Sequence, residues 1–133
     1  ETMERLADLL TRKSREVGHP IYIIADEPYR ELVYGGIQVP FLPKLYPDTV
    51  VCYSYSKSLS LPGERIGYVY VPRQAQEHDA LYAAICGAAR VSGHVCAPSL
   101  WQKVIAQCAH LHPDLAQYDH NRRLLWQRLT AMG

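Results

Sequence analysis

The sequence predicts an α/β fold, in which strands of a larger sheet are flanked by helices. Three observations favour it: three short strand-like segments, the first of them an unbroken apolar run, segments of helical periodicity on both sides of them, and a loop rich in glycine and proline after the first run. Unbroken apolar runs are typical of strands covered on both faces, as in a parallel sheet. Alternation, the mark of a half-exposed strand, is absent from the first run.

The elements are expected in the order helix, strand, loop, strand, turn, strand and three helices. Apolar residues at helical spacing predict a first helix, which Gly18 and Pro20 end. The strands are expected at residues 21–25, 49–55 and 66–71, with a loop at 35–48 and a compact turn at 56–65. The later helices are expected at 74–90, at 100–108 and from Pro113 onward.

Composition excludes several functional classes. A chain of 133 residues fits one domain, and its net charge of +1 leaves no electrostatic footprint for nucleic acid or an anionic membrane. No apolar run approaches the roughly 20 residues that span a bilayer, so a cytoplasmic protein is expected. The chain opens at Glu1 beside one helical pattern and closes at Gly133 after another, which favours a piece of a longer protein.

Cysteine and histidine spacing predicts neither disulfides nor a metal site. The four cysteines lie far apart without a C-x-x-C pair, and a disulfide framework is not expected in a chain of this size and composition. His110 and His112 form the one suggestive histidine pair, but they lack the cysteine or carboxylate partners of a metal centre.

Polar residues at the strand ends are the candidate functional groups. Asp26 ends the first strand, and Ser54, Ser56 and Lys57 end the second. Ligands of open α/β sheets bind beyond the carboxyl ends of the strands, so these groups and Arg65 are expected at one crevice. They suit a ligand with a cationic ring nitrogen, an electrophilic carbonyl and a phosphate. The same residues also fit a turn cap and a solvated lysine.

Two motifs resemble those of class I/II aminotransferases, the fold-type I enzymes that use pyridoxal phosphate. Residues 25–29 resemble the D-E-x-Y element, and residues 54–68 resemble the signature S-x-S-K-x-x-x-x-P-G-x-R-x-G. The resemblance implies part of the large domain, with a mostly parallel central sheet flanked by helices. Residues 1–112 would form the later half of that pyridoxal-phosphate-binding domain, and residues 113–133 the start of the helix leading to a small domain.

The resemblance gives three residues chemical roles. Lys57 would hold pyridoxal phosphate as a Schiff base, which requires an unprotonated amine, and would then act as general base and acid. Asp26 would pair with the pyridinium nitrogen and keep it protonated, so that the ring withdraws electrons from the substrate. Tyr29 would hydrogen-bond the ring oxygen.

The other matched positions would bind the phosphate or shape the backbone. Arg65 supplies a planar guanidinium for the phosphate, and the hydroxyls of Ser54 and Ser56 would lie beside it. Gly63 and Gly67 are interpreted as serving backbone geometry and close approach. Arg30 is interpreted as a member of an ion pair at the surface or at a domain interface. Nearby aromatic residues are interpreted as packing, namely Tyr34, Tyr53, Tyr68 and Tyr70.

The implied activity is transfer of an amino group between an amino acid and a 2-oxo acid, by a homodimeric parent protein. Family members also have an upstream phosphate-binding turn, an aromatic that stacks on the cofactor and a downstream arginine that binds the substrate carboxylate. These 133 residues contain none of them. We therefore expect the chain alone to be inactive.

Three alternatives to an aminotransferase remain open. A carbon–sulfur lyase or a decarboxylase of the same fold would use the same lysine, aspartate, tyrosine and arginine. A transcription regulator could use an aminotransferase-like domain to sense pyridoxal phosphate. A purely structural α/β module would leave Lys57 as a solvated loop residue.

Overall fold

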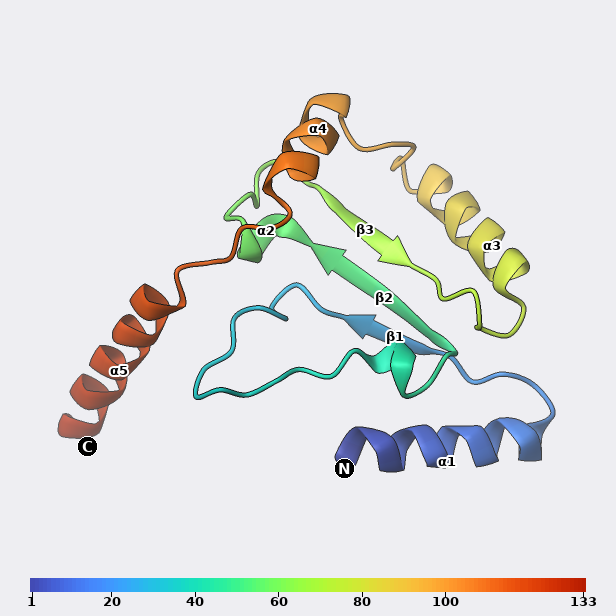
Figure 1. Ribbon diagram of the computed structural model, residues 1–133, viewed down its shortest axis with the longest axis horizontal. Coiled ribbons are helices and arrows are strands. Elements are labelled where there is room, and N and C mark those ends of the chain that lie inside the picture. Colours follow the sequence, from blue (N-terminus) through green and yellow to red (C-terminus); the bar gives the residue numbers. More distant parts are fainter.

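The computed structural model describes residues 1–133, with a three-stranded sheet at the centre and helices around its margin (Figure 1). The strands are β1 (Ile23–Asp26), β2 (Thr49–Ser54) and β3 (Gly67–Tyr70), in the order β1-β2-β3. The long helices are α1 (Thr2–Val17), α3 (His78–Val91), α4 (Ser99–Cys108) and α5 (Leu115–Ala131). Two short helical turns, η1 (Leu42–Lys44) and α2 (Tyr55–Ser58), flank β2.

The pairing of the strands brings three chain segments to one edge of the sheet. β1 and β2 are parallel, with Asp26 opposite Cys52, so their carboxyl ends lie at the same edge. β3 is antiparallel to β2, with Gly67 opposite Ser54, so β3 begins where β2 ends. The sheet is therefore mixed, and the parallel pairing expected for the first strand is confirmed.

Side-chain hydrogen bonds fix the opposite edge of the sheet. The buried carboxylate of Asp48, just before β2, accepts hydrogen bonds from the backbone N–H and the side-chain amide of Gln76, at 2.6 and 2.8 Å. The hydroxyl of Tyr46 donates to the carbonyl of Ile21 at 2.7 Å. These bonds tie the starts of β1 and β2 to the segment that follows β3.

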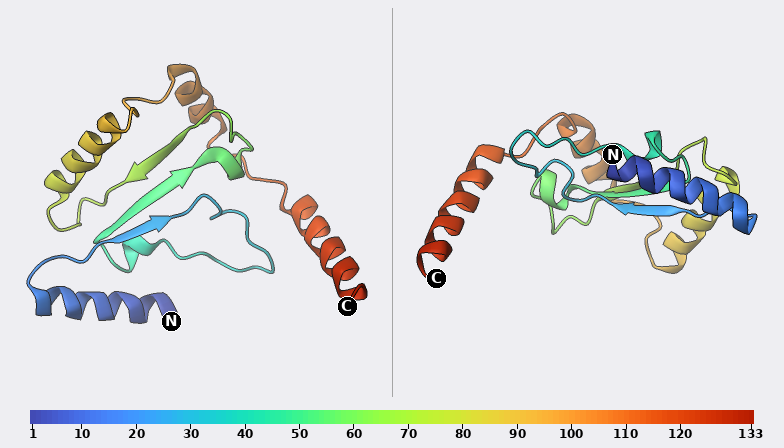
Figure 2. Two further views of the ribbon diagram at one scale, coloured as in Figure 1. Left: turned by 180° about the vertical axis from the view of Figure 1, so that it is seen from behind. Right: turned by 90° about the horizontal axis from the view of Figure 1, so that it is seen from below.

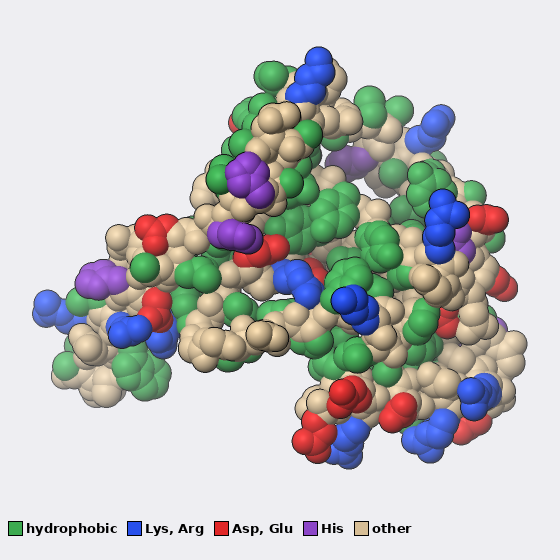
Figure 3. All heavy atoms as spheres, viewed as in Figure 1, with side chains coloured by type: hydrophobic (Ala, Val, Ile, Leu, Met, Phe, Trp, Pro, Cys, Tyr) green, Lys and Arg blue, Asp and Glu red, His purple; other side chains and the backbone are tan.

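The helices cover little of the sheet. The chain exposes 9963 Å², against about 7,100 Å² for a compact monomer of its mass. Neither α3 nor α5 has a buried residue, and α5 lies apart from the sheet in both views of Figure 2. Hydrophobic side chains accordingly show on the surface along the sheet and beside the flanking helices (Figure 3).

One expectation about burial is wrong within this chain. The first strand was expected to be covered on both faces, yet Ile24 is 74% exposed while its neighbour Ala25 is buried. One face of β1 therefore packs and the other is open. The apolar run is explained only if other polypeptide covers the open face.

The order of the elements is as expected, and their bounds differ by a few residues. The helix expected from residue 74 begins at His78, and the expected turn opens with the helical turn α2. The expected end of α1 is confirmed, since Gly18 has a φ of 77° and its N–H bonds to the carbonyl of Ser14. None of the helices combines the length and apolar character needed to cross a membrane.

Candidate functional site

Lys57 and Tyr29 lie next to each other beyond the carboxyl ends of the parallel strands. Tyr29 follows β1 by three residues, and Lys57 is the third residue of α2, directly after β2. The Lys57 Nζ atom is 5.6 Å from the centroid of the Tyr29 ring. Both side chains are exposed. The two residues therefore meet on an open surface, while no contact joins Lys57 to Asp26 or Arg65.

Ser54 determines where the lysine turn begins. Its backbone is extended, with φ −134° and ψ 136°, and its Oγ accepts a hydrogen bond from the N–H of Ser56 at 3.2 Å. Serine at an N-cap satisfies one of the free N–H groups of a helix start. The two hydroxyl oxygens are 2.7 Å apart and share a hydrogen bond. The two predicted hydroxyls are therefore held together, one residue before Lys57.

The return of the chain toward β3 is conformationally unusual. Ser60 and Arg65 have positive φ values of 54° and 50°, which are uncommon for residues other than glycine. The exposed Arg65 side chain donates one hydrogen bond, from Nη1 to the carbonyl of Pro62 at 3.1 Å. The rest of its guanidinium is available to an anion.

Gly67 serves close approach, as expected, and Gly63 does not. A Cβ on Gly67 would overlap the carbonyl oxygen of Tyr53 and lie 3.1 Å from the Cα of Ser54. A Cβ on Gly63 would meet nothing within 4 Å. Gly67 therefore lets β3 run against the last two residues of β2.

The charged side chains of the site are not neutralised by one another. Asp26, Lys57 and Arg65 take part in none of the ion pairs of the chain and are exposed. Burial raises the pKa of the Cys52 thiol, and the charge of Asp26, its partner across the strands, raises it further. The carboxylate of Asp26 thus affects the Cys52 thiol on β2 and has no cationic side chain paired with it.

The segment that carries Tyr29 is held by Arg30. Its guanidinium forms an ion pair with Glu27 at 2.6 Å, and both side chains are largely buried. It also donates to the carbonyl of Val39 at 2.8 Å and lies over the Phe41 ring. An ion pair is present as expected, but it is local and largely buried and not at the surface. Together with the bond to Val39 it fastens the turn after β1 to the following loop.

A hydrogen bond beneath the lysine turn was not expected from the sequence. The Tyr53 hydroxyl donates to Oγ of Ser58 at 2.7 Å. The Tyr53 ring stacks on Tyr68 and meets Tyr55 edge-on, with both pairs of centroids 5.1 Å apart. The expected packing role of these tyrosines is confirmed. No local pattern in the sequence signals this bond, whereas the stacking of Tyr53 on Tyr68 follows from their pairing across β2 and β3.

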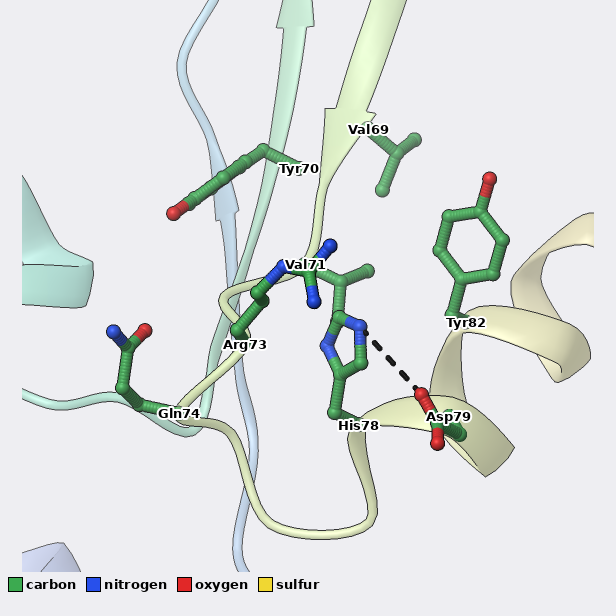
Figure 4. Close-up of a pocket in the computed structure, with 8 residues that line it drawn as sticks. All are labelled: Val69, Tyr70, Val71, Arg73, Gln74, His78, Asp79 and Tyr82. Atoms are coloured by element: carbon green, nitrogen blue, oxygen red, sulfur yellow. Dashed lines mark ion pairs between the residues drawn. The ribbon is translucent and has the colours of Figure 1, made fainter.

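A hollow of the surface lies away from Lys57. A cavity of about 690 Å³ follows the far end of β3, where His78 and Asp79 form a weak ion pair at 3.9 Å beside Tyr82 (Figure 4). Because β3 is antiparallel to β2, this cavity is at the opposite edge from Lys57.

Two other features, a metal site and disulfide bonds, were considered from the sequence. No group of three or more histidine, cysteine, aspartate or glutamate side chains is placed to hold a metal. The four cysteines are free.

The strand-end groups match one kind of ligand. A lysine amine suits a carbonyl carbon, a carboxylate suits a cationic ring nitrogen, and an arginine with two hydroxyls suits a phosphate. In this structure the lysine is beside the tyrosine, the hydroxyls are paired and the arginine is exposed. The sheet edge thus belongs to an α/β protein and carries side chains whose chemistry suits a phosphorylated carbonyl compound.

Comparison with known proteins identifies the family. The model of the family described as aminotransferase class I and II matches residues 2–132, and the chain belongs to that family. Membership implies pyridoxal phosphate as the cofactor, which the donor set described above fits. The predicted fold, part of the large domain of such an enzyme, is confirmed by the structural comparisons below.

Two solved structures and one sequence relative illustrate the likeness. The crystal structure of an aminotransferase from Eubacterium rectale is 60% identical, with a TM-score of 0.93 over 99% of this chain and 33% of that chain. A pyridoxal-phosphate-dependent aminotransferase from Streptococcus suis is 30% identical, with a TM-score of 0.54 over 98% of this chain and 30% of that one. Aromatic-amino-acid aminotransferase 2 of Thermococcus litoralis is 27% identical over 94% of this chain and 34% of its own length. The chain therefore spans about a third of the length of the proteins it matches.

Proposed function

We propose that this chain is part of a pyridoxal-phosphate-dependent aminotransferase that moves an amino group between an amino acid and a 2-oxo acid. The observation that carries the proposal is the placement of Lys57 beside Tyr29, at the edge where the two motif-bearing strands end. Family membership over residues 2–132 supports it.

Lys57 is assigned two tasks in this reaction. Its amine would hold the cofactor as a Schiff base, and after the substrate amine takes that place the freed amine would move a proton at the substrate α-carbon. The cofactor, when bound, supplies an electron-withdrawing ring that makes this proton acidic. The position of Lys57 after β2, with its side chain in no ion pair, suits both tasks.

The remaining site residues are assigned to binding and orientation. Asp26 would hold a proton on the ring nitrogen, and Tyr29 would donate a hydrogen bond to the ring oxygen. Arg65 would bind the phosphate together with the paired hydroxyls of Ser54 and Ser56. Each role needs a side chain with free hydrogen-bonding capacity, which these residues have.

We assign residues 1–112 to the later half of the cofactor-binding domain, and 113–133, which contain α5, to the start of the connection toward a small domain. The exposed face of β1 and the uncovered helices support a larger protein around this part. We further propose that the parent is a homodimer, and that this chain alone does not transaminate because groups that grip the substrate lie outside it.

Reductive trapping tests the proposal. The purified protein is incubated with pyridoxal phosphate, treated with borohydride and mapped by peptide mass spectrometry. Its four lysines are Lys13, Lys44, Lys57 and Lys103, all of them exposed. We expect the pyridoxyl adduct at Lys57, with its loss in Lys57→Ala and its retention in the matched control Lys44→Ala. Equal labelling of the four lysines would refute the assignment.

A second measurement addresses the reaction itself. The protein is mixed with labelled amino acids and 2-oxo acids, and products are followed by mass spectrometry. We expect no turnover by this chain and amino transfer by the full-length parent. Release of carbon dioxide or of a thiol by the parent, without amino transfer, would identify a decarboxylase or a lyase instead.

A further inference from the structure

Lys57 is carried by a turn that cannot hold itself in place. α2 has only four residues, and helices that short are not stable without outside contacts. The Lys57 side chain is exposed and in no ion pair, and its Nζ atom lies over the Tyr29 ring. The direction in which its amine leaves the turn is therefore set by whatever fixes the two ends of α2.

The first end is fixed by Ser54 and the second by Ser58. Ser54 caps the start of α2, as described above. Ser58, the residue after the lysine, is only 6% exposed, and its Oγ accepts the hydrogen bond from the Tyr53 hydroxyl. A buried hydroxyl without a partner costs free energy, so this bond holds the end of the turn down on β2.

Tyr53 is a rigid and lasting donor for that bond. Its ring is held between Tyr55 and Tyr68, so the hydroxyl has a fixed position. Burial, the largest effect, raises the pKa of Tyr53 to about 12, the bond to Ser58 lowers it, and the nearby Glu31 raises it. The Oε2 atom of Glu31 is buried without a hydrogen-bond partner, and its negative charge opposes loss of the phenol proton.

We propose that Tyr53 is a positioning residue for Lys57: its hydrogen bond to Ser58 anchors the back of α2 and aims the amine toward Tyr29. The inference rests on the proposed function, because Lys57 must be the cofactor lysine for its aim to matter. Tyr53 itself lies on the β2 face away from Ser54 and touches no reacting group. Its effect is transmitted through the turn alone.

The test compares labelling of Lys57 with labelling of the other three lysines in the same sample. The ratio of pyridoxyl adduct at Lys57 to the mean at Lys13, Lys44 and Lys103 reports local aim and cancels differences in reagent and time. We expect Tyr53→Phe and Ser58→Ala each to lower this ratio by about threefold to tenfold, the effect of one lost hydrogen bond.

Two further variants separate positioning from general loosening. Tyr70→Phe removes a phenol hydroxyl at the far end of β3, so we expect an unchanged ratio. Ser58→Thr keeps the hydroxyl, so its ratio should recover most of what Ser58→Ala loses. Circular dichroism and thermal unfolding of each variant, and the pH profile of trapping, are recorded alongside. A variant that does not fold is set aside, and the Ser58→Ala and Ser58→Thr pair then decides.

The outcomes distinguish this inference from the proposed function. A wild-type protein without preference for Lys57 refutes the proposed function. Preference for Lys57 that persists unchanged in folded Tyr53→Phe and Ser58→Ala leaves the function standing and overturns the positioning role. Equal losses in Ser58→Thr and Ser58→Ala also overturn it, because the hydroxyl would then not be the cause.

Discussion

The junction of β2 and β3 beside the lysine turn depends on the absence of a side chain at Gly67. A Cβ there would overlap the carbonyl oxygen of Tyr53 and crowd the Cα of Ser54 at 3.1 Å. Both are backbone atoms, so no side chain can rotate away to relieve the overlap. Gly67→Ala must therefore separate the strands where Ser54 caps α2.

The cost follows from two opposing contributions. Forcing an extra carbon into a packed site costs about 1–3 kcal/mol. Replacing glycine by alanine reduces the freedom of the unfolded chain and returns about 0.5–1 kcal/mol. Because the overlap is with backbone, we take the upper part of the first range and expect a net loss of about 2 kcal/mol in the free energy of unfolding.

Urea denaturation followed by circular dichroism measures this loss. With an m-value of about 2 kcal/mol/M, a loss of about 2 kcal/mol lowers the midpoint by about 1 M. Gly87→Ala is the matched control, since a Cβ on Gly87 in α3 meets nothing within 4 Å. It should raise stability by about 0.5–1 kcal/mol, through helix propensity. A Gly67→Ala midpoint equal to or above the wild-type value would refute the reasoning.

Three further predictions concern titrating groups. Asp26→Asn removes a charge that raises the pKa of Cys52, so alkylation of that thiol at mildly alkaline pH should become faster relative to Cys86, which is exposed. The phenol of Tyr53 should titrate at about pH 12, and ultraviolet titration should lose that late step in Tyr53→Phe. Since this pKa is raised in the folded state, its stabilising contribution is present below the unfolded value of 10.0 and is lost as pH rises through about 12. Hydrogen bonds from two arginines lower the pKa of Asp119 below 3.8, so its contribution to α5 is present above that value and is lost at lower pH; carboxyl carbon NMR shifts measure it directly.

Much of the fold follows from local sequence signals. The apolar runs predict three strands, even though the third includes Gly67, and Gly18 ends α1 by adopting a left-handed conformation. The placement of Asp26 and Ser54 at one edge follows from the parallel pairing of β1 and β2. These features depend on residues near in sequence or on a common rule of sheet topology.

Other features depend on contacts that no local pattern reveals. The face of β1 that carries Ile24 is open. The apolar run alone does not show this, because burial of that face depends on polypeptide that is distant in the sequence. The bond from Tyr53 to Ser58 requires the helical start of α2, where a plain turn was expected. Gly63 and Gly67 look equivalent in the motif, and only the spacing of β2 and β3 shows which one needs to lack a side chain.

Because the site is exposed, the position of the Lys57 amine and the acceleration of proton transfer have different requirements. Lys57 and Tyr29 are brought together by strand pairing and by the two anchors of α2, all within residues 23–58. Electrostatic effects between exposed charges are weak, about 1 kcal/mol for a pair 4 Å apart in water, and grow severalfold when the site is covered. The chain can therefore direct the lysine amine, while the strong fields that accelerate proton transfer need a covered site. For this reason we expect selective trapping at Lys57 together with the absence of turnover, and turnover by this chain alone would show that an open site suffices.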